Sequence, residues 1–173
     1  MPNPSLYAPW RMDYIRSLDK PDGGCFLCEA ATCAVEEYRD RLILWRTPNV
    51  VVLLNRFPYT NGHVLVAPLA HTADFDTLSD AELLDLQKET AAAVRLLKRG
   101  VSAQGFNVGI NLGRVAGAGV PGHLHQHVVP RWAGDTNFIS VVGDVRIVPQ
   151  ATGQLYDELA RLVNADCQMP IAK

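Results

Sequence analysis

One long amphipathic helix, with a clear start and a clear end, divides the other structured segments of this chain into two groups. Ser79 and Glu82 have the spacing of a capping box, and Gly100 follows a basic pair, so we expect a helix over residues 79–99. The spacing of its mainly apolar positions puts them on one face. These positions are Leu83, Leu86, Thr90, Ala93, Val94 and Leu97.

Short apolar segments on both sides of this helix are typical of strands. Strands separated by one long helix, without regular β-α-β alternation, indicate an α+β fold built on an antiparallel β-sheet. The sequence therefore predicts such a sheet with one long helix and a C-terminal helix. The strands are expected at 41–46, 49–54, 63–67, 106–112 and 123–129, with a short strand near 145–148 and the last helix over 153–165.

The length of 173 residues, of which 48% are hydrophobic, suits a single domain with arms. We divide the chain into an N-terminal arm (1–24), a main domain (25–150) and a C-terminal helix and tail (151–173). The arm is rich in proline and glycine yet carries aromatic side chains. We expect it to pack on its own domain or on a partner chain.

The charge balance and the start of the chain exclude several classes of protein. A net charge of −2 provides no basic field for nucleic acid. No apolar run reaches the roughly 18 residues of a membrane span, and the first residues do not resemble a secretory signal. We therefore expect a cytoplasmic protein. In that reducing compartment, the C-x-x-C pair of Cys25 and Cys28 indicates a metal or redox site rather than a disulfide.

Three of the five histidines lie within five residues, at positions 123, 125 and 127. On a strand these alternate side chains would share one face, where one imidazole can act as a nucleophile and another can contact a phosphate. The Gly-rich loop 113–122 comes just before them, and residues without a Cβ let backbone N–H groups approach a phosphate closely. A chance cluster, or a metal-binding stripe with an ordinary turn before it, is the alternative.

The segment His123–Val129 resembles the signature of the histidine-triad (HIT) family, in which histidines alternate with apolar residues. Gln126 departs from that pattern, at a position that faces away from the histidines. Residues 55–68 are similar to the family's Asn…Gly-His segment. Residues 105–113 and 130–138 resemble the branch of bacterial diadenosine-tetraphosphate phosphorylases and Fhit-like proteins. The likeness covers roughly residues 6–150, so it implies that the main domain is a HIT domain.

The resemblance implies a nucleotidyl transferase or hydrolase that cleaves dinucleoside polyphosphates. His125 would attack the α-phosphate and form a nucleotidyl-histidine, which phosphate or water then splits. His127 would contact the phosphate or leaving group. The resemblance also places His63, near the triad, among the catalytic residues with His125 and His127. The loop's last part, 116–121, lacks the Ser or Gln found in relatives, which leaves the acceptor open. Nucleotide-binding residues implied by the resemblance are Asn55, which would bind the ribose, and Asn111, Gly113, Gly119, His125 and His127 near the phosphates.

The resemblance also implies a structural zinc site. Cys25 and Cys28 have the spacing of a zinc knuckle, and tetrahedral zinc takes four ligands from cysteine and histidine. In HIT proteins and the related galactose-1-phosphate uridylyltransferases, a histidine after the third strand and the first triad histidine complete this set. Here they are His71 and His123. The alternative is a reduced cysteine pair packed under the arm.

Two other functions remain open from the sequence. Some HIT branches are nucleoside phosphoramidases, and a nucleotide-binding sensor could carry the same motif with incidental turnover. The matches at 105–113 and 130–138 favour the polyphosphate-cleaving enzyme. HIT domains are commonly homodimers, so we expect a homodimer with a small nucleotide as its substrate, and no nucleic acid or membrane partner.

Overall fold

The computed structural model describes residues 24–136 and 148–165. Each element below has the bounds that the structure gives it. The elements are α2 (Phe26–Thr32), η1 (Val35–Glu37), α3 (Tyr38–Arg41), β1 (Ile43–Arg46), β2 (Val50–Leu54), β3 (Val64–Pro68), η2 (Phe75–Thr77), α4 (Asp80–Gly100), β4 (Gly105–Ile110), η3 (Arg114–Ala116), β5 (Gln126–Arg131) and α6 (Thr152–Ala165).

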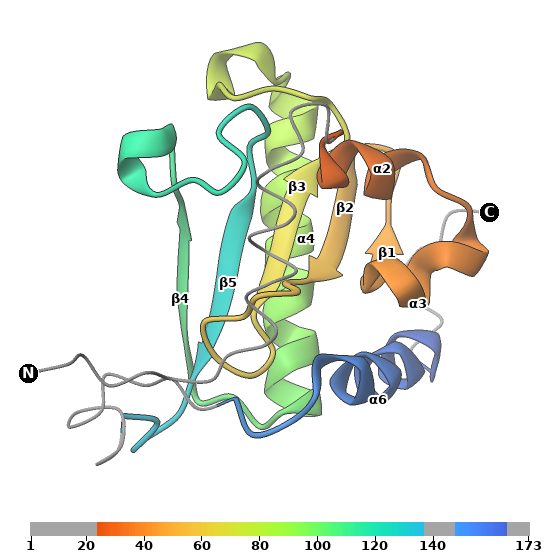
Figure 1. Cartoon of the computed structure of the whole chain (residues 1–173), viewed down its shortest axis with the longest axis vertical. Helices are drawn as coiled ribbons and strands as arrows, with labels where there is room; N and C mark the ends of the chain where they lie inside the picture. The colour runs from red at the N-terminus through yellow and green to blue at the C-terminus, as the bar shows by residue number, and fades with distance from the viewer. Residues whose placement is uncertain (1–23, 137–147, 166–173) are drawn as a thin grey trace, which may run out of the picture.

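The described strands form one antiparallel sheet in the order β1-β2-β3-β5-β4 (Figure 1). The first three strands follow one another, and α4 then carries the chain from β3 to the far edge. β5 returns between β3 and β4. The predicted α+β class with an antiparallel sheet, one long helix and a C-terminal helix is confirmed.

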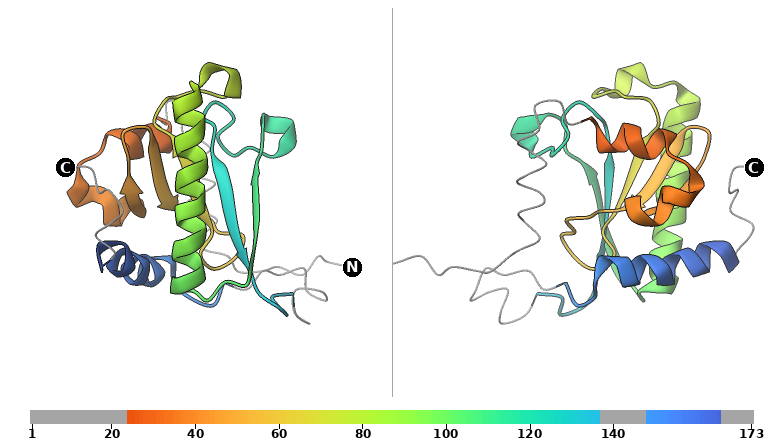
Figure 2. Two further views of the ribbon diagram at one scale, coloured as in Figure 1. Left: turned by 180° about the vertical axis from the view of Figure 1, so that it is seen from behind. Right: turned by 45° about the vertical axis from the view of Figure 1, so that its right-hand side comes forward.

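The two faces of the sheet are covered differently. The long helix α4 crosses one face, and α6 packs beside it in the same apolar core, as the rear view in Figure 2 shows. On the opposite face, α2 buries Leu27 and Ala30 against the β1–β3 half of the sheet. The β5–β4 half of that second face carries the cavity described below.

Helix α4 begins at the predicted capping box and ends one residue beyond the predicted end. The Ser79 hydroxyl accepts the backbone N–H of Glu82, and the Glu82 carboxylate accepts the backbone N–H of Ser79, which completes the capping box. Gly100 is the last helical residue, where α6 approaches closely: a Cβ there would lie 2.3 Å from Leu159 Cδ2. A larger residue at this position would therefore force the Leu159 side chain to move.

The fifth strand differs from the prediction at both ends. It begins at Gln126, so the expectation that His123 and His125 lie on a strand is wrong. Ahead of it, the Leu124 N–H donates to the Thr72 carbonyl and the His123 ring donates to the Pro68 carbonyl, in place of the regular ladder that begins at Gln126. The strand also runs past Pro130. Beyond Val128 it pairs with β4 alone, and a proline is tolerated on such an edge.

Several predictions concern residues that lie outside the part of the chain described by the structure. The arm 1–24 lies outside the described residues except for its last residue, and so does most of the strand expected near 145–148. The division into arm, main domain and tail stays a prediction. Within the two described stretches, no helix has both the length and the apolar character needed to span a membrane.

A candidate histidine active site beside a candidate metal centre

Three histidines meet at the β3–β5 junction, on the face opposite α4. His63 stands just before β3, His127 lies on β5, and His125 precedes β5. His63 Nε2 lies 3.0 Å from His127 Nδ1, and the His125 and His127 rings are edge to face with centroids 5.0 Å apart. Leu65 and His127 are register partners, so both point to the same face of the sheet. The structure thus brings together the three residues predicted to be catalytic.

The neighbours of His63 determine which ring nitrogens of His63 and His127 carry protons. The backbone N–H of Tyr59 donates to His63 Nδ1 at 3.1 Å, and the Asn55 amide lies 3.2 Å from the same nitrogen. In the neutral ring, the proton must then be on Nε2, from which it is donated to His127 Nδ1. His127 in turn carries its proton on Nε2. That nitrogen lies 3.5 Å from the Asn111 amide, at the cavity.

His125 is oriented by the backbone of its own segment. Its Nδ1 lies 2.8 Å from the His123 carbonyl oxygen, which can only accept, so Nδ1 carries the proton. The neutral ring therefore has its free lone pair on Nε2. His125 is 6% exposed, and in its neutral form this contact selects the tautomer whose Nε2 can form a bond.

Burial keeps His127 uncharged at neutral pH. Loss of solvent, followed by the proximity of His125, lowers the pKa of His127 to about 4. Tyr59 adds to this cover, because its ring stacks on His63 at 4.7 Å and on His127 at 5.8 Å between centroids. Sequence reasoning missed Tyr59, for which the only signal is an aromatic residue four positions before His63.

A cavity of about 350 Å³ opens beside His127. Its walls are Tyr59 from the β2–β3 loop, the edge strand β4 with the residue that follows it, and the neighbouring strand β5. Of the predicted nucleotide ligands, Asn111 and His127 line it, whereas Asn55 and His125 do not. The lining residues are Tyr59, Asn107, Val108, Gly109, Ile110, Asn111, His127 and Val129.

The remaining predicted nucleotide residues lie in two loops. Gly113 has a φ of 77°, a left-handed conformation that favours glycine, at the start of the Gly-rich loop. A Cβ at Gly119 would meet no atom within 4 Å, so packing does not explain that glycine. The Asn55 side-chain oxygen Oδ1 accepts the Phe57 N–H at 2.9 Å, and the side-chain nitrogen Nδ2 faces His63. The Asn55 side chain therefore orders the loop between β2 and β3.

The four predicted metal ligands converge from three segments of the chain. The ligand atoms of Cys25, Cys28, His71 and His123 all lie within 4.8 Å of one another. A tetrahedral zinc ion with two sulfur and two nitrogen ligands needs separations of roughly 3.3–3.8 Å. The shortest contacts here are 3.1 Å from Cys28 to His71 Nδ1 and 3.2 Å from Cys25 to His123 Nδ1. This cluster can hold a metal ion after small side-chain adjustments.

The proton positions also suit a metal. His123 donates from Nε2 to the Pro68 carbonyl at 2.9 Å, which leaves the Nδ1 lone pair directed at the cysteines. A ligating histidine is commonly oriented by such a contact of its other nitrogen. Burial, then the neighbouring Cys25, raises the pKa of the Cys28 thiol. Metal binding at neutral pH must therefore displace a proton from this thiol.

An antiparallel five-stranded sheet with ordered imidazoles at the β3–β5 junction and a Cys₂His₂ cluster beside them defines a histidine-triad protein. The family model of the HIT domain matches residues 36–134. The chain belongs to the HIT family.

Two curated relatives and one solved structure illustrate the similarity. AP-4-A phosphorylase of Mycobacterium tuberculosis is 36% identical over 150 residues, which cover 84% of this chain and 76% of that protein. The asymmetrical bis(5'-nucleosyl)-tetraphosphatase of Schizosaccharomyces pombe is 33% identical over 93 residues, or 54% of this chain and 50% of that protein. The crystal structure of a Zn-bound histidine triad family protein from Mycobacterium smegmatis is 28% identical. It has a TM-score of 0.60 and covers 86% of this chain and 99% of that chain.

Proposed function

We propose that this chain is an enzyme that cleaves dinucleoside polyphosphates of the diadenosine tetraphosphate type through a nucleotidyl-histidine on His125. The observation that carries the proposal is the contact of His125 Nδ1 with the His123 carbonyl at 2.8 Å. It leaves Nε2 unprotonated, as a nucleophile requires. The similarity to AP-4-A phosphorylase over 84% of the chain supports the choice of substrate class.

In the first step, His125 Nε2 forms a bond to the α-phosphorus while the bond from phosphorus to the bridging oxygen breaks. The leaving polyphosphate needs a hydrogen-bond donor at that oxygen. His127 Nε2–H and the Asn111 amide lie 3.5 Å apart and face the same cavity, so both can donate to one substrate oxygen. His63 keeps the His127 proton on Nε2 through its own bond to Nδ1.

In the second step, an acceptor oxygen attacks the phosphorus and the bond to His125 breaks. The acceptor is phosphate in a phosphorylase and water in a hydrolase. The similarity to the M. tuberculosis phosphorylase is higher and longer than the similarity to the S. pombe tetraphosphatase, which favours phosphate. Gly113, Gly119 and the rest of the Gly-rich loop would offer backbone N–H groups to the phosphates, and Asn55 would bind the ribose through its carbonyl's second lone pair.

The proposal includes a structural zinc ion at Cys25, Cys28, His71 and His123. Four protein ligands leave no open coordination position, so the ion would supply stability and no chemical step. It would tie α2 to the segment that leads into β5. The Zn-bound M. smegmatis protein of the same fold supports zinc as the metal.

We also propose that the working form is a homodimer joined along β4. This strand has β5 as its neighbour on one side and forms an edge of the sheet on the other. Among the described residues no strand pairs with that edge. Its Val108 is 47% exposed, and an edge strand with an exposed apolar residue favours pairing with a second copy.

The function is tested by incubating the protein with diadenosine tetraphosphate, with and without inorganic phosphate. ADP plus ATP, formed only with phosphate, is the expected result, and AMP plus ATP would identify a hydrolase. Absence of both products would overturn the proposal and leave a phosphoramidase or a sensor.

His125→Asn tests the assignment of the nucleophile. Since an amide nitrogen is not nucleophilic, we expect turnover to fall by at least about a thousandfold while AMP binding persists. Arg39→Gln, which removes an exposed ion pair with Asp157 far from the histidines, is the control and should keep full activity. Two successive displacements at the α-phosphorus should retain its configuration in a chiral thiophosphate substrate. Net inversion would mean a single direct displacement and would rule out His125 as the nucleophile.

A further inference from the structure

The two cysteines of the metal cluster depend on a helix that is too short to be stable alone. Cys25 precedes α2 and Cys28 lies in its first turn. The helix has seven residues and no side-chain cap at its start, whereas isolated helices of fewer than about 12 residues are marginal in water. Something else in the chain must therefore hold α2 in place before a metal arrives.

Arg46 of β1 holds the far end of this helix. One guanidinium nitrogen, Nη1, lies 2.7 Å from Ala31 O, 3.1 Å from Cys33 O and 3.4 Å from Ala30 O. These are carbonyls of the last turn of α2 and its C-cap residue, which have no partner within a helix. The last turn of α2 contains no basic residue of its own, so the positive charge that it favours comes from β1.

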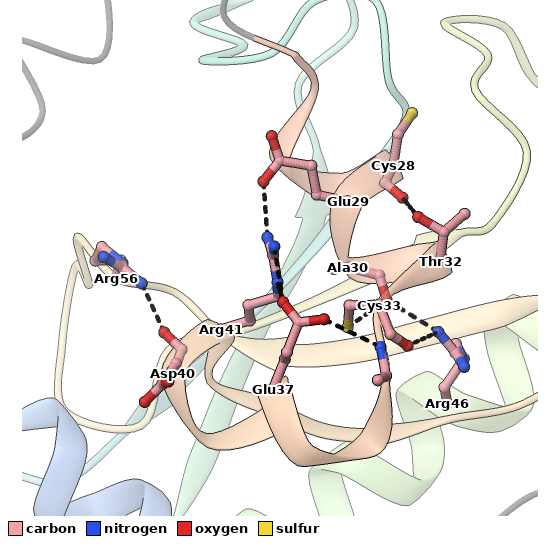
Figure 3. A network of polar contacts seen from close by, with 11 residues as sticks. Cys28, Glu29, Ala30, Thr32, Cys33, Glu37, Asp40, Arg41, Arg46 and Arg56 are labelled. Carbon is pink, nitrogen blue, oxygen red and sulfur yellow. Dashed lines mark hydrogen bonds and ion pairs between the residues drawn. The ribbon is translucent and has the colours of Figure 1, made fainter.

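Figure 3 shows that the Cys28 side chain and Arg46 lie at opposite ends of α2. Arg41 holds the same helix from the side through a 2.7 Å ion pair with Glu29. Leu27 and Ala30 anchor it from below, with exposures of 0% and 1%. The apolar contacts fix the depth of the helix, and the polar contacts of Arg46 and Arg41 restrict its rotation and its position along its axis.

That rotation matters because the other two ligands do not belong to α2. His71 and His123 are set by the end of β3 and by the Pro68 carbonyl. A tilt of α2 would move both sulfurs together relative to those two rings. We propose that Arg46 is a positioning residue for the metal centre, which holds α2 so that Cys25 and Cys28 stay within reach of His71 and His123 without metal.

This inference rests on the metal centre of the proposed function and adds a residue that touches neither the metal nor its ligands' side chains. According to this inference, the four ligands are already in position before a metal ion binds. Residues that orient metal ligands typically change metal affinity by about 10- to 100-fold when they are replaced.

The test compares zinc release from the full-length unmodified protein, Arg46→Gln and Arg39→Gln. Each is loaded with one equivalent of zinc and challenged with a chromogenic chelator. We expect Arg46→Gln to release zinc at least about tenfold faster. Arg39→Gln removes an arginine that binds Asp157 through two hydrogen bonds and should release zinc at the unmodified rate.

A spectroscopic measurement separates positioning from general stability. With cobalt in place of zinc, the unmodified protein should show the visible bands of a tetrahedral site, and Arg46→Gln should show weakened or shifted bands. The melting temperatures of the metal-free proteins serve as the comparison. If Arg46→Gln does not fold, Arg46→Lys, which keeps a charged donor, replaces it and should give an intermediate release rate.

The outcomes are distinguishable. Equal zinc release and equal cobalt spectra for the unmodified protein and the folded Arg46 variant would overturn the role of Arg46 and leave the metal centre intact. An unmodified protein that binds no zinc would overturn the metal centre itself, and the role of Arg46 with it. Neither result bears on the cleavage of dinucleoside polyphosphates by His125.

Discussion

Two histidines only two positions apart are oriented in opposite senses by backbone carbonyls. His123 donates from Nε2 to Pro68 and presents Nδ1 to the cysteines, whereas His125 donates from Nδ1 to His123 and keeps Nε2 free. The alternation of histidines in the sequence predicts that both matter. It does not predict their tautomers, because one accepting carbonyl is that of Pro68 in β3, 55 residues away in the sequence, and the other depends on the irregular backbone ahead of β5.

The lowered pKa of His127 predicts that the stability of the folded protein depends on pH. The folded protein keeps this residue neutral down to about pH 4, while the unfolded chain takes up a proton near pH 6.5. Between these values the unfolded state binds one more proton, so stability falls as the pH drops from 6.5 toward 4. We expect a loss of about 1–2 kcal/mol, after allowance for the half-buried position of the ring.

Urea unfolding of the unmodified protein and of His127→Gln at about pH 7 and pH 4.5 measures this effect. The advantage of the unmodified protein over the variant should shrink at the lower pH. Metal loss in acid affects both proteins, and His63 and His125, the titratable neighbours of His127, are present in both. A difference that does not change with pH would contradict the assigned shift.

Gln126 interrupts the apolar pattern of the signature, and the structure gives it a partner. It is 4% exposed on the α4 side of β5, where its carbonyl accepts the amide of Gln87 at 3.1 Å. Gln87 is exposed and can turn to water, but Gln126 cannot. Gln87→Ala should therefore cost about 1–3 kcal/mol by leaving a buried amide unpaired.

The double variant Gln87→Ala with Gln126→Val is the matched comparison for this pair. Replacing both partners removes the unpaired group, so its free energy of unfolding should lie above that of Gln87→Ala alone. Chemical denaturation of the four proteins in the cycle gives the coupling. If the effects of the two single substitutions on the free energy of unfolding simply add, the hydrogen bond between Gln87 and Gln126 does not contribute to stability.

At the scale of elements, the crossing of α4 and α6 depends on one small residue. Gly100→Ala would ordinarily favour a helix, but here its Cβ would press on Leu159, which is 0% exposed. We expect a net destabilisation of about 1–3 kcal/mol from overpacking. Gly153→Ala in α6 is the control. Its Cβ meets nothing within 4 Å, so it should be neutral or stabilising by up to about 1 kcal/mol.

Thermal unfolding of the two alanine variants decides this prediction. A melting temperature for Gly100→Ala at or above that of the unmodified protein would contradict the prediction. It would mean that Leu159 of α6 moves aside without loss of stability.

Elements with strong local signals were predictable from the sequence, and elements defined by distant contacts were not. Helix α4 has its own cap and apolar stripe, and β2 is a continuous apolar run, so both match within a residue or two. The start of β5 depends on Thr72 and Pro68, far away in the chain. Helix α2 has no side-chain cap at its start and no basic residue in its last turn, so its sequence carries no clear signal for either end.

At the scale of the whole molecule, the edge strand β4 leads to the expectation of a homodimer. Sedimentation should give twice the chain mass of 19.0 kDa. Val108→Lys should weaken dimerisation at least about tenfold, since it buries a charge at the joined edge. Val115→Lys is the control, because Val115 is fully exposed in η3, outside β4. A monomer at micromolar concentration for the unmodified protein would contradict the dimer.

The spread of the metal cluster along the chain sets an order of events during synthesis. Cys25 and Cys28 leave the ribosome first, His71 follows 43 residues after Cys28, and His123 comes 98 residues after Cys25. A nascent chain therefore passes through a long interval with two or three ligands and no complete site. Since His123 is aligned by Pro68 of β3, all four ligands converge only after the chain between β3 and β5 has been made. Binding of a metal ion by all four residues would therefore be a late step, possible only once most of the sheet has been synthesised.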